Sequence, residues 1–286
     1  MAGPSPTVRQ RRLARMLRRL REGAGLTIEQ VAEKLEISPS TISRIETAHV
    51  RIRPRDLRDL LDMYEVTGPQ RDELLQIARE RHQQAWWHEY KGLPKHAFAG
   101  FEAEASSISQ YSVQLIPGLL QDEAYARAVL GAIHLDARQG NDEKSLQLRM
   151  DRQALLTGER APEYWVVLDE AALRRTVGGW RVMQAQLQRL IDVAARPNVT
   201  LQVLPFSAGA HAGMDGEFTI LHYRDAEDPD VVYIENTAGD VYLEDPDVTR
   251  RYNSIFDHLR AAALDPASSL QKMADLRDQL HQPERS

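Results

Sequence analysis

The stretch GLTIEQVAEKLEISPSTISRIE, residues 25–46, constrains the fold of this chain more than any other feature. Thr27 suits the N-cap of a short helix, with Gln30 three residues later as its capping-box partner. Ser38 suits the N-cap of a second helix, with Pro39 at its first position. Because the turn between the two is too short for an antiparallel pair, the stretch predicts a helix-turn-helix unit.

Apolar side chains at helical spacing predict further helices on either side of this unit. Leu13, Met16, Leu17 and Leu20 define one face of a helix that Gly23 and Gly25 end. A fourth helix is expected from Pro54, and a fifth follows the break at residues 68–69. The first quarter of the chain is therefore expected to be all-α.

Charge is distributed unevenly along the chain. Residues 1–55 contain 12 Lys or Arg and 5 Asp or Glu, which is a net charge of +7. Residues 1–64 contain 13 Lys or Arg and 8 Asp or Glu, which is a net charge of +5. Because the whole chain has a net charge of -6, residues 65–286 have a net charge of -11. A basic segment attached to an acidic remainder indicates nucleic-acid binding by that segment, in spite of the acidic total.

The segment LRRLREGAGLTIEQVAEKLEISPSTISRIE resembles the DNA-binding domain of Cro/C1-type regulators, the XRE family, over residues 9–66. The resemblance implies that the third helix enters the major groove of double-stranded DNA. Arg44 is the candidate for a bidentate guanine contact. The following loop would contact phosphates, which positions the domain without reading sequence. The DNA-binding residues implied are Pro39, Ser40, Thr41, Ser43, Arg44, Arg51, Arg53 and Arg55.

Three positions qualify this resemblance. Glu46 has two interpretations, a contact with cytosine or the structural ion pair with Arg21 that relatives make, and the ion pair is favoured. Ile28 replaces a phosphate-binding glutamine of many members, so that contact is not expected. Glu36 replaces a glycine in the turn, at a residue that tends to adopt a positive φ.

The acidic remainder predicts a mixed α/β (α+β) domain with a small, partly antiparallel sheet. Alternating or continuous apolar runs predict strands, with a hairpin between the last two. Amphipathic spacing predicts helices between and after them. The expected strands are residues 107–112, 164–169, 199–205, 217–223 and 230–236, and the expected helices are 122–133, 143–156, 182–196, 249–264 and 268–280.

Three segments of this remainder, IPGLLQDEAYARAVL, LPFSAGAHAGMDGEFTIL and VVYIENTAGDVYLEDP, resemble the C-terminal domain of actinobacterial WhiJ-like, antitoxin-like regulators. The resemblance spans about residues 86–280. It implies a module for dimerisation, partner binding or sensing, with a small BldB-like protein as the expected partner. An antitoxin-like protein that sequesters this partner, with DNA binding as autoregulation, is the alternative function. A ligand-sensing or enzymatic domain is a further alternative.

Four residues of the acidic remainder are candidates for a ligand or partner site, namely Trp86, Trp87, His211 and Asp215. For each of them a purely structural role is the competing interpretation. Trp86 and Trp87 follow a polar run, and core packing is the favoured interpretation for at least one of them. His211 and Asp215 lie with Glu217 in a glycine-rich loop, for which a structural turn is favoured over a ligand or partner site. The chain has no cysteine and none of the HExxH, GxSxG, Walker or GxGxxG motifs. No enzyme activity, cofactor or metal site is therefore expected.

The expected organisation has three parts, namely residues 1–66 as the DNA-binding domain, 67–90 as a linking helix region and 91–286 as the regulatory or partner-binding domain. Neither a secretory leader nor a membrane span is expected. The chain is thus predicted to be a cytoplasmic regulator that binds an operator as a homodimer.

Overall fold

The computed structural model describes residues 8–50, 52–79, 89–90, 93, 96–133, 142–158, 160–224, 228–236 and 239–280. The chain forms two compact units, Met1–Phe101 and Glu102–Ser286. We call them the head and the body. The helix α6, His96–Glu104, crosses the boundary between them. No helix of the described residues has the length and hydropathy to span a membrane.

Residues 8–79 of the head form five helices, as the spacing of apolar residues predicts: α1 (Val8–Gly23), α2 (Ile28–Lys34), α3 (Pro39–Glu46), α4 (Pro54–Met63) and α5 (Gly68–Arg79). The predicted caps are present. Thr27 and Gln30 form both hydrogen bonds of a capping box ahead of α2, and the Ser38 side chain accepts from the backbone N–H of Thr41 at the start of α3. These caps fix where each helix begins and therefore which face it presents.

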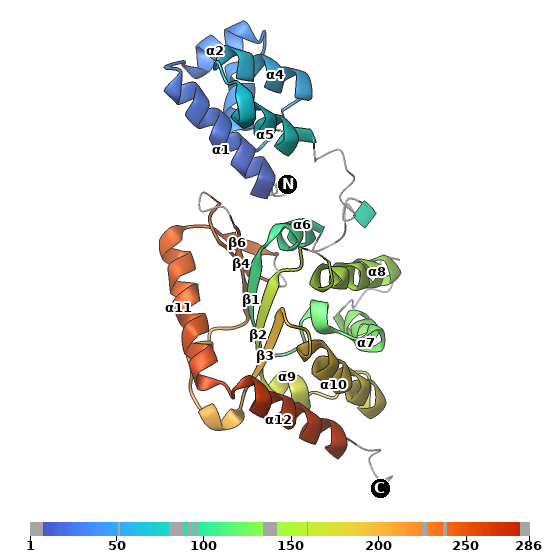
Figure 1. Cartoon of the computed structure of the whole chain (residues 1–286). Coiled ribbons are helices and arrows are strands. Elements are labelled where there is room, and N and C mark those ends of the chain that lie inside the picture. Colours follow the sequence, from blue (N-terminus) through green and yellow to red (C-terminus); the bar gives the residue numbers. More distant parts are fainter. Residues whose placement is uncertain are drawn as a thin grey trace. The chain divides into compact units, whose positions relative to one another are not determined.

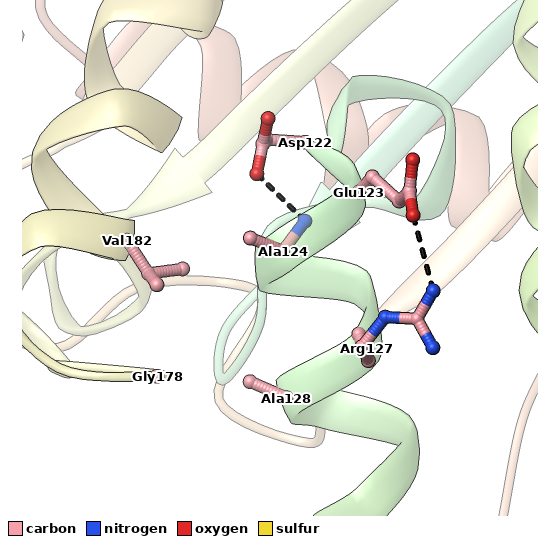
Figure 2. A pocket seen from close by; sticks show the side chains of 7 residues that line it. All are labelled: Asp122, Glu123, Ala124, Arg127, Ala128, Gly178 and Val182. Carbon is pink, nitrogen blue, oxygen red and sulfur yellow. Dashed lines mark hydrogen bonds and ion pairs between the residues drawn. The ribbon is translucent and has the colours of Figure 1, made fainter.

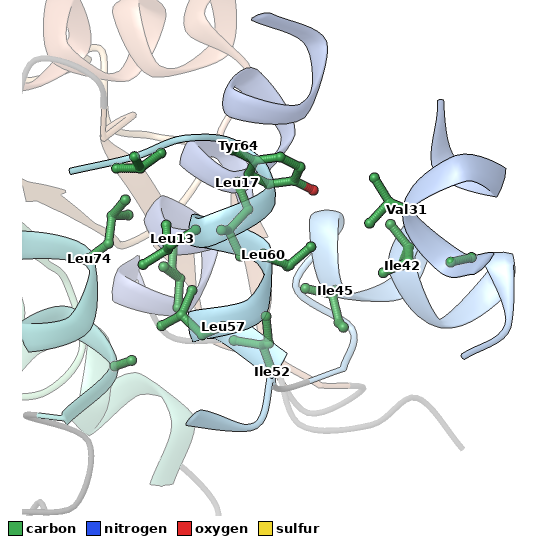
Figure 3. Close-up of a cluster of buried hydrophobic side chains, with 14 residues drawn as sticks. Leu13, Leu17, Val31, Ile42, Ile45, Ile52, Leu57, Leu60, Tyr64 and Leu74 are labelled. Atoms are coloured by element: carbon green, nitrogen blue, oxygen red, sulfur yellow. The ribbon is translucent and has the colours of Figure 1, made fainter. Parts of the chain in front are cut away.

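One hydrophobic core holds the helices of the head together. Figure 3 shows Leu17 of α1, Ile45 of α3, and Leu57 and Leu60 of α4 meeting in it. Leu74 of α5 belongs to the same core, so α5 is part of the packing of the head. The buried members of this core are Leu13, Leu17, Val31, Ala32, Ile42, Ile45, Ile52, Leu57, Leu60, Leu61, Tyr64, Val66, Leu74 and Ala78.

The turn between α2 and α3 depends on one residue in the left-handed region. Glu36 has a φ of 55°, which confirms the expectation for this position. The backbone N–H of Ile37 then reaches the Ala32 carbonyl at 3.0 Å. The left-handed residue therefore reverses the chain and sets α3 at an angle to α2.

The body is built on a mixed six-stranded sheet in the order β3-β2-β1-β4-β5-β6. The strands are β1 (Ser107–Ser112), β2 (Glu163–Asp169), β3 (Val199–Leu204), β4 (Phe218–His222), β5 (Val231–Ile234) and β6 (Val241–Leu243). β1, β2 and β3 pair in parallel, and β4, β5 and β6 continue the sheet in antiparallel pairs. The predicted mixed fold and the predicted hairpin of the fourth and fifth strands are confirmed.

Helices cover both faces of this sheet. In Figure 1, α11 (Pro246–Ala262) lies on one side of the sheet, and α7 (Glu123–Ile133), α8 (Asp142–Arg152) and α10 (Trp180–Ala194) lie on the other. On the α11 side, Phe256 and Leu259 pack against Tyr111, Val167 and Ile220 of the strands. α12 (Pro266–Gln279) packs on α10 and β3. The parallel strands β2 and β3 are thus buried along most of their length, as expected for parallel strands joined by helices.

Several elements differ from the predicted ranges. The helix expected over residues 143–156 ends at Arg152 and continues as the 3-10 helix Gln153–Leu156. α10 and α11 begin two and three residues earlier than predicted, because Gly179 and Asp245 occupy their N-cap positions. The short elements α6, α9 (Glu170–Arg174) and β6 were not predicted. α9 and β6 contain five and three residues, too few to display a period of 3.6 or 2.

Candidate nucleic-acid interface

The helix α3 is held in the head by its inward side chains. Ile42 and Ile45 are buried in the head core, and α3 contacts both α1 and α2. Ser40 and Arg44, four residues apart, share the opposite face of the helix and are exposed. An eight-residue helix has little stability by itself, so the core contacts fix the orientation of the outward face.

A buried ion pair also fixes α3. Arg21 Nε donates to Glu46 Oε1 at 2.7 Å and Arg21 Nη2 donates to Glu46 Oε2 at 2.9 Å. The side chains are 11% and 5% exposed, and the carboxylate raises the pKa of Arg21. Arg21 Nη1 donates to the carbonyl of Leu26 at 2.9 Å. One guanidinium therefore ties together α1, the loop before α2 and the last residue of α3, and Glu46 faces Arg21 instead of the outer surface.

The amino end of α3 carries a cluster of hydroxyl groups. Ser38 Oγ lies 2.9 Å from Ser40 Oγ and 2.8 Å from Thr41 Oγ1, and it accepts from the Thr41 backbone N–H at 3.2 Å. Pro39 beside them is exposed. The amino end of a helix carries partial positive charge. Ser40 and Thr41 can therefore offer hydrogen bonds to base edges or phosphates from a fixed position.

Arg44 is the exposed cation on the outward face of α3. It makes no ion pair or hydrogen bond through its side chain with any residue that the structure describes. Ser43, beside it, is half-buried, and its carbonyl accepts from Thr47 Oγ1 at 2.8 Å. The guanidinium of Arg44 is thus available to an acceptor outside the chain.

Two of the arginines predicted for the loop lie in the described part of the head, and only Arg53 precedes α4, since Arg55 lies in the first turn of that helix. Arg53 is exposed at the N-cap of α4, which has no side-chain cap hydrogen bond. Arg55 is 91% exposed, with Nε 4.0 Å from Asp59 Oδ2. Arg51 lies outside the described residues. Arg53 and Arg55 therefore present positive charge at the start of α4, the helix that follows α3 in the chain.

The residue that sequence reasoning missed on this surface is His49. It is exposed in the turn after α3, and its Nδ1 lies 3.0 Å from Thr47 Oγ1. Its neighbour Ala48 has a φ of 59°. The spacing of residues 47 and 49 gives no sign of this hydrogen bond, because it spans the left-handed turn at residue 48.

In the body, the candidate residue His211 lies in the segment between β3 and β4 and contacts residues near the carboxyl ends of β1 and β2. Its Nδ1 accepts from the Gly213 backbone N–H at 3.2 Å, and its Nε2 lies 3.9 Å from Asp169 Oδ2. Its ring packs edge-on against Tyr111, with 5.9 Å between the ring centroids. Burial raises the pKa of Tyr111, and the nearby carboxylates of Asp169 and Glu217 raise it further. A Cβ at Gly213 would lie 2.5 Å from Tyr111 Cε1, so this close approach requires glycine.

Asp215 does not join this group, and Glu217 acts on it only through its charge. Asp215 is exposed, and Glu217 Oε2 accepts from Ser112 Oγ at 3.1 Å. Trp86 and Trp87 lie outside the described residues. No group of three or more potential metal ligands occurs in the part of the chain that the structure describes.

A surface pocket of about 560 Å³ lies between the amino end of α7 and the start of α10. Figure 2 shows small apolar side chains, Ala124, Ala128 and Val182, beside the charged groups of Asp122 and Arg127. Asp122 Oδ1 accepts from the Ala124 backbone N–H at 2.8 Å. The charged groups that line the pocket therefore already have partners. Asp122 caps α7, and Arg127 forms ion pairs with Glu123 and Glu143. None of the predicted site residues lines this pocket.

Comparison with known families assigns both parts of the chain. A family described as a helix-turn-helix domain matches residues 12–74. A second family, described as a domain of unknown function (DUF5753), matches residues 96–275. Neither a curated protein nor a solved structure was found to match the chain.

Proposed function

Because the chain belongs to the family of the domain of unknown function DUF5753 and carries a helix-turn-helix domain before it, we propose that it is a sequence-specific regulator of the Cro/C1 type. A helix-turn-helix domain indicates DNA binding. The observation that carries the specific proposal is Arg44, an exposed guanidinium without a described partner on the outward face of a helix anchored on its other side.

In this proposal the groups of the head have separate roles. Arg44 donates two hydrogen bonds to the O6 and N7 atoms of a guanine in the major groove. Ser40 and Thr41 serve bases or phosphates at the amino end of α3, and Arg53 and Arg55 contact phosphates of the backbone. The Arg21–Glu46 pair contacts no DNA and keeps α3 at the angle that these contacts need.

A mobility-shift titration of the full chain on the DNA upstream of its own gene tests the proposal. Counterion release makes the logarithm of the binding constant fall linearly with the logarithm of salt, by about 0.9 for each phosphate neutralised. We expect binding at 50 mM salt, a steep loss by 200 mM, and tighter binding to the upstream DNA than to a mixed-sequence duplex. Equal affinity for the two duplexes would argue against sequence-specific recognition. Absence of a complex at low salt would argue against DNA binding.

We propose further that the chain binds as a homodimer, with two heads on two half-sites whose centres lie about 10 base pairs or a multiple of this apart. The protein would act in the cytoplasm, where the operator would lie. Hydroxyl-radical footprinting on a bound operator checks this proposal. Two protected patches at that spacing are expected. A single protected patch that fits one head would show that the chain binds as a monomer.

For the body we propose a binding role rather than a catalytic one, in dimerisation, partner binding or sensing. The resemblance to WhiJ-like proteins supports a small BldB-like protein as the partner. Purification of the tagged full chain from its own cells, with and without competing operator DNA, tests this. A stoichiometric small protein in both eluates supports partner binding. Release of DNA when that protein is added favours the antitoxin-like alternative. A shift in thermal unfolding with a metabolite would favour sensing.

A further inference from the structure

His49 has a fixed place beside the proposed DNA contacts of the head. It is the one histidine of residues 1–79. The backbone around it is held by two hydrogen bonds to α3, from the Ala48 N–H to the Ile45 carbonyl at 3.0 Å and from the Val50 N–H to the Arg44 carbonyl at 2.9 Å. The exposed ring therefore lies between Arg44 and Arg53 in the chain, in a turn with a defined backbone.

The hydrogen bonds of Thr47 determine which nitrogen of His49 carries the proton. Thr47 Oγ1 donates its single hydrogen to the carbonyl of Ser43 at 2.8 Å, because a carbonyl can only accept. Toward His49, the same oxygen can then only accept, so the Nδ1 atom at 3.0 Å must be the donor. A neutral imidazole has one N–H. The neutral ring of His49 therefore presents a bare lone pair at Nε2.

A lone pair at Nε2 cannot donate to a phosphate, whereas a protonated ring has an N–H there and a full positive charge. We propose, on the basis of the proposed function, that His49 donates a hydrogen bond to a DNA phosphate only when its ring is charged. Each head would then gain one contact with the DNA backbone. The contact would lie next to those of Arg53 and Arg55 and would carry no sequence information.

The direction of the pH effect follows from the charges near the ring. A DNA phosphate favours the charged ring, so binding takes up a proton, and affinity falls as pH rises. No described carboxylate forms an ion pair with His49. Among the described residues from α3 to the first turn of α4, the charged groups are Arg44, Glu46, Arg53, Arg55 and Asp56, and Glu46 is held by Arg21 of α1. Arg51, in the same segment, lies outside the described residues.

The test measures the affinity of the full chain for its upstream DNA and for a mixed-sequence duplex between pH 5.5 and 8.5 at several salt concentrations. The wild type should lose about two- to fivefold in affinity per head across this range, as for an exposed ion pair. Its salt slope should become shallower by about 0.9 per head. Both changes should appear on both duplexes, since the contact is to the backbone.

Three variants separate this explanation from a general pH effect. His49→Gln should abolish the pH dependence, whereas His49→Lys should keep the affinity and the steep slope across the range. Thr47→Val, which removes the acceptor for Nδ1, lets the neutral ring carry its proton on Nε2, so it should bind more tightly than the wild type at pH 8. The matched control is His258→Gln. His258 is an exposed body histidine whose Nδ1 lies 2.7 Å from the Ser254 carbonyl.

The outcomes distinguish this inference from the proposed function. If the chain binds DNA and His49→Gln keeps the pH dependence of the wild type, the assignment of His49 is overturned. It is also overturned if Thr47→Val leaves the affinity at pH 8 unchanged while circular dichroism shows an intact fold. If the wild type binds neither duplex at any pH, the proposed function fails instead.

Discussion

Arg44 and Arg53 have the same side-chain chemistry in different structural settings. Arg44 projects from the outward face of α3, and Arg53 precedes α4 in an exposed loop. Arg44→Ala should weaken operator binding by about 1–3 kcal/mol and relax the preference at one base pair. Arg53→Ala should weaken binding to all sequences alike and make the salt slope shallower by about one. Binding assays on an operator and its single-base variants measure both. Equal effects of Arg44→Ala on every sequence would remove its role in base recognition.

The Arg21–Glu46 pair predicts a large effect on stability. Glu46→Gln keeps the shape of the side chain but leaves the buried guanidinium without its carboxylate, which should destabilise the head by about 3 kcal/mol. Asp59→Asn is the matched control, since Asp59 Oδ2 lies 4.0 Å from Arg55 Nε in an exposed pair of the head that does not involve Arg21. It should change stability by less than about 1 kcal/mol. Native-state hydrogen exchange of head peptides measures both values. Equal values would show that the buried pair contributes no more than a surface pair.

At the scale of single elements, the turn between α2 and α3 contains a residue under strain. Glu36 has a φ of 55°, which a side chain with a Cβ disfavours and glycine tolerates. Glu36→Gly should therefore stabilise the head by about 0.5–1 kcal/mol. Glu33→Gly, inside α2, should destabilise it by a similar amount. Denaturant unfolding of both variants provides the comparison. A loss of stability in Glu36→Gly would show that the glutamate makes compensating contacts in its native form.

The elements that the sequence predicts are those whose pattern is local. Caps at Thr27 and Ser38 and the alternation of strands such as 107–112 and 230–236 depend on neighbouring residues, and the structure contains them. The short elements α9 and β6 depend on the sheet that surrounds them. For the same reason, the outward face of α3 could be predicted from spacing, whereas the hydrogen bond of His49 to Thr47 could not.

Across the whole chain, the change from basic to acidic composition falls within the same region as the change from an all-helical unit to a mixed α/β unit. The net charge of residues 1–64 is +5 and that of the remainder is -11, so the positive charge lies within the helical head. Within the body, Arg152 forms a buried ion pair with Glu102 at 2.7 Å, which ties α6 to α8 instead of offering a charge to DNA. A basic head therefore accounts for DNA binding by an acidic protein, because phosphates respond to local charge within about a Debye length.

The two hydrophobic cores predict that the head and the body lose structure independently. Leu57 in the head core and Leu259 in the body core are both fully buried, and truncation of either to alanine should cost about 2–5 kcal/mol. Leu57→Ala should speed hydrogen exchange in α1 to α5 and lower the apparent DNA affinity, while the exchange of the strands stays as in the wild type. Leu259→Ala should do the reverse, with unchanged affinity at low temperature. If either substitution destabilised both sets of peptides equally, the units would be coupled in a single cooperative transition. A signal from the body could then reach α3 by folding energy alone, with no rearrangement of the head.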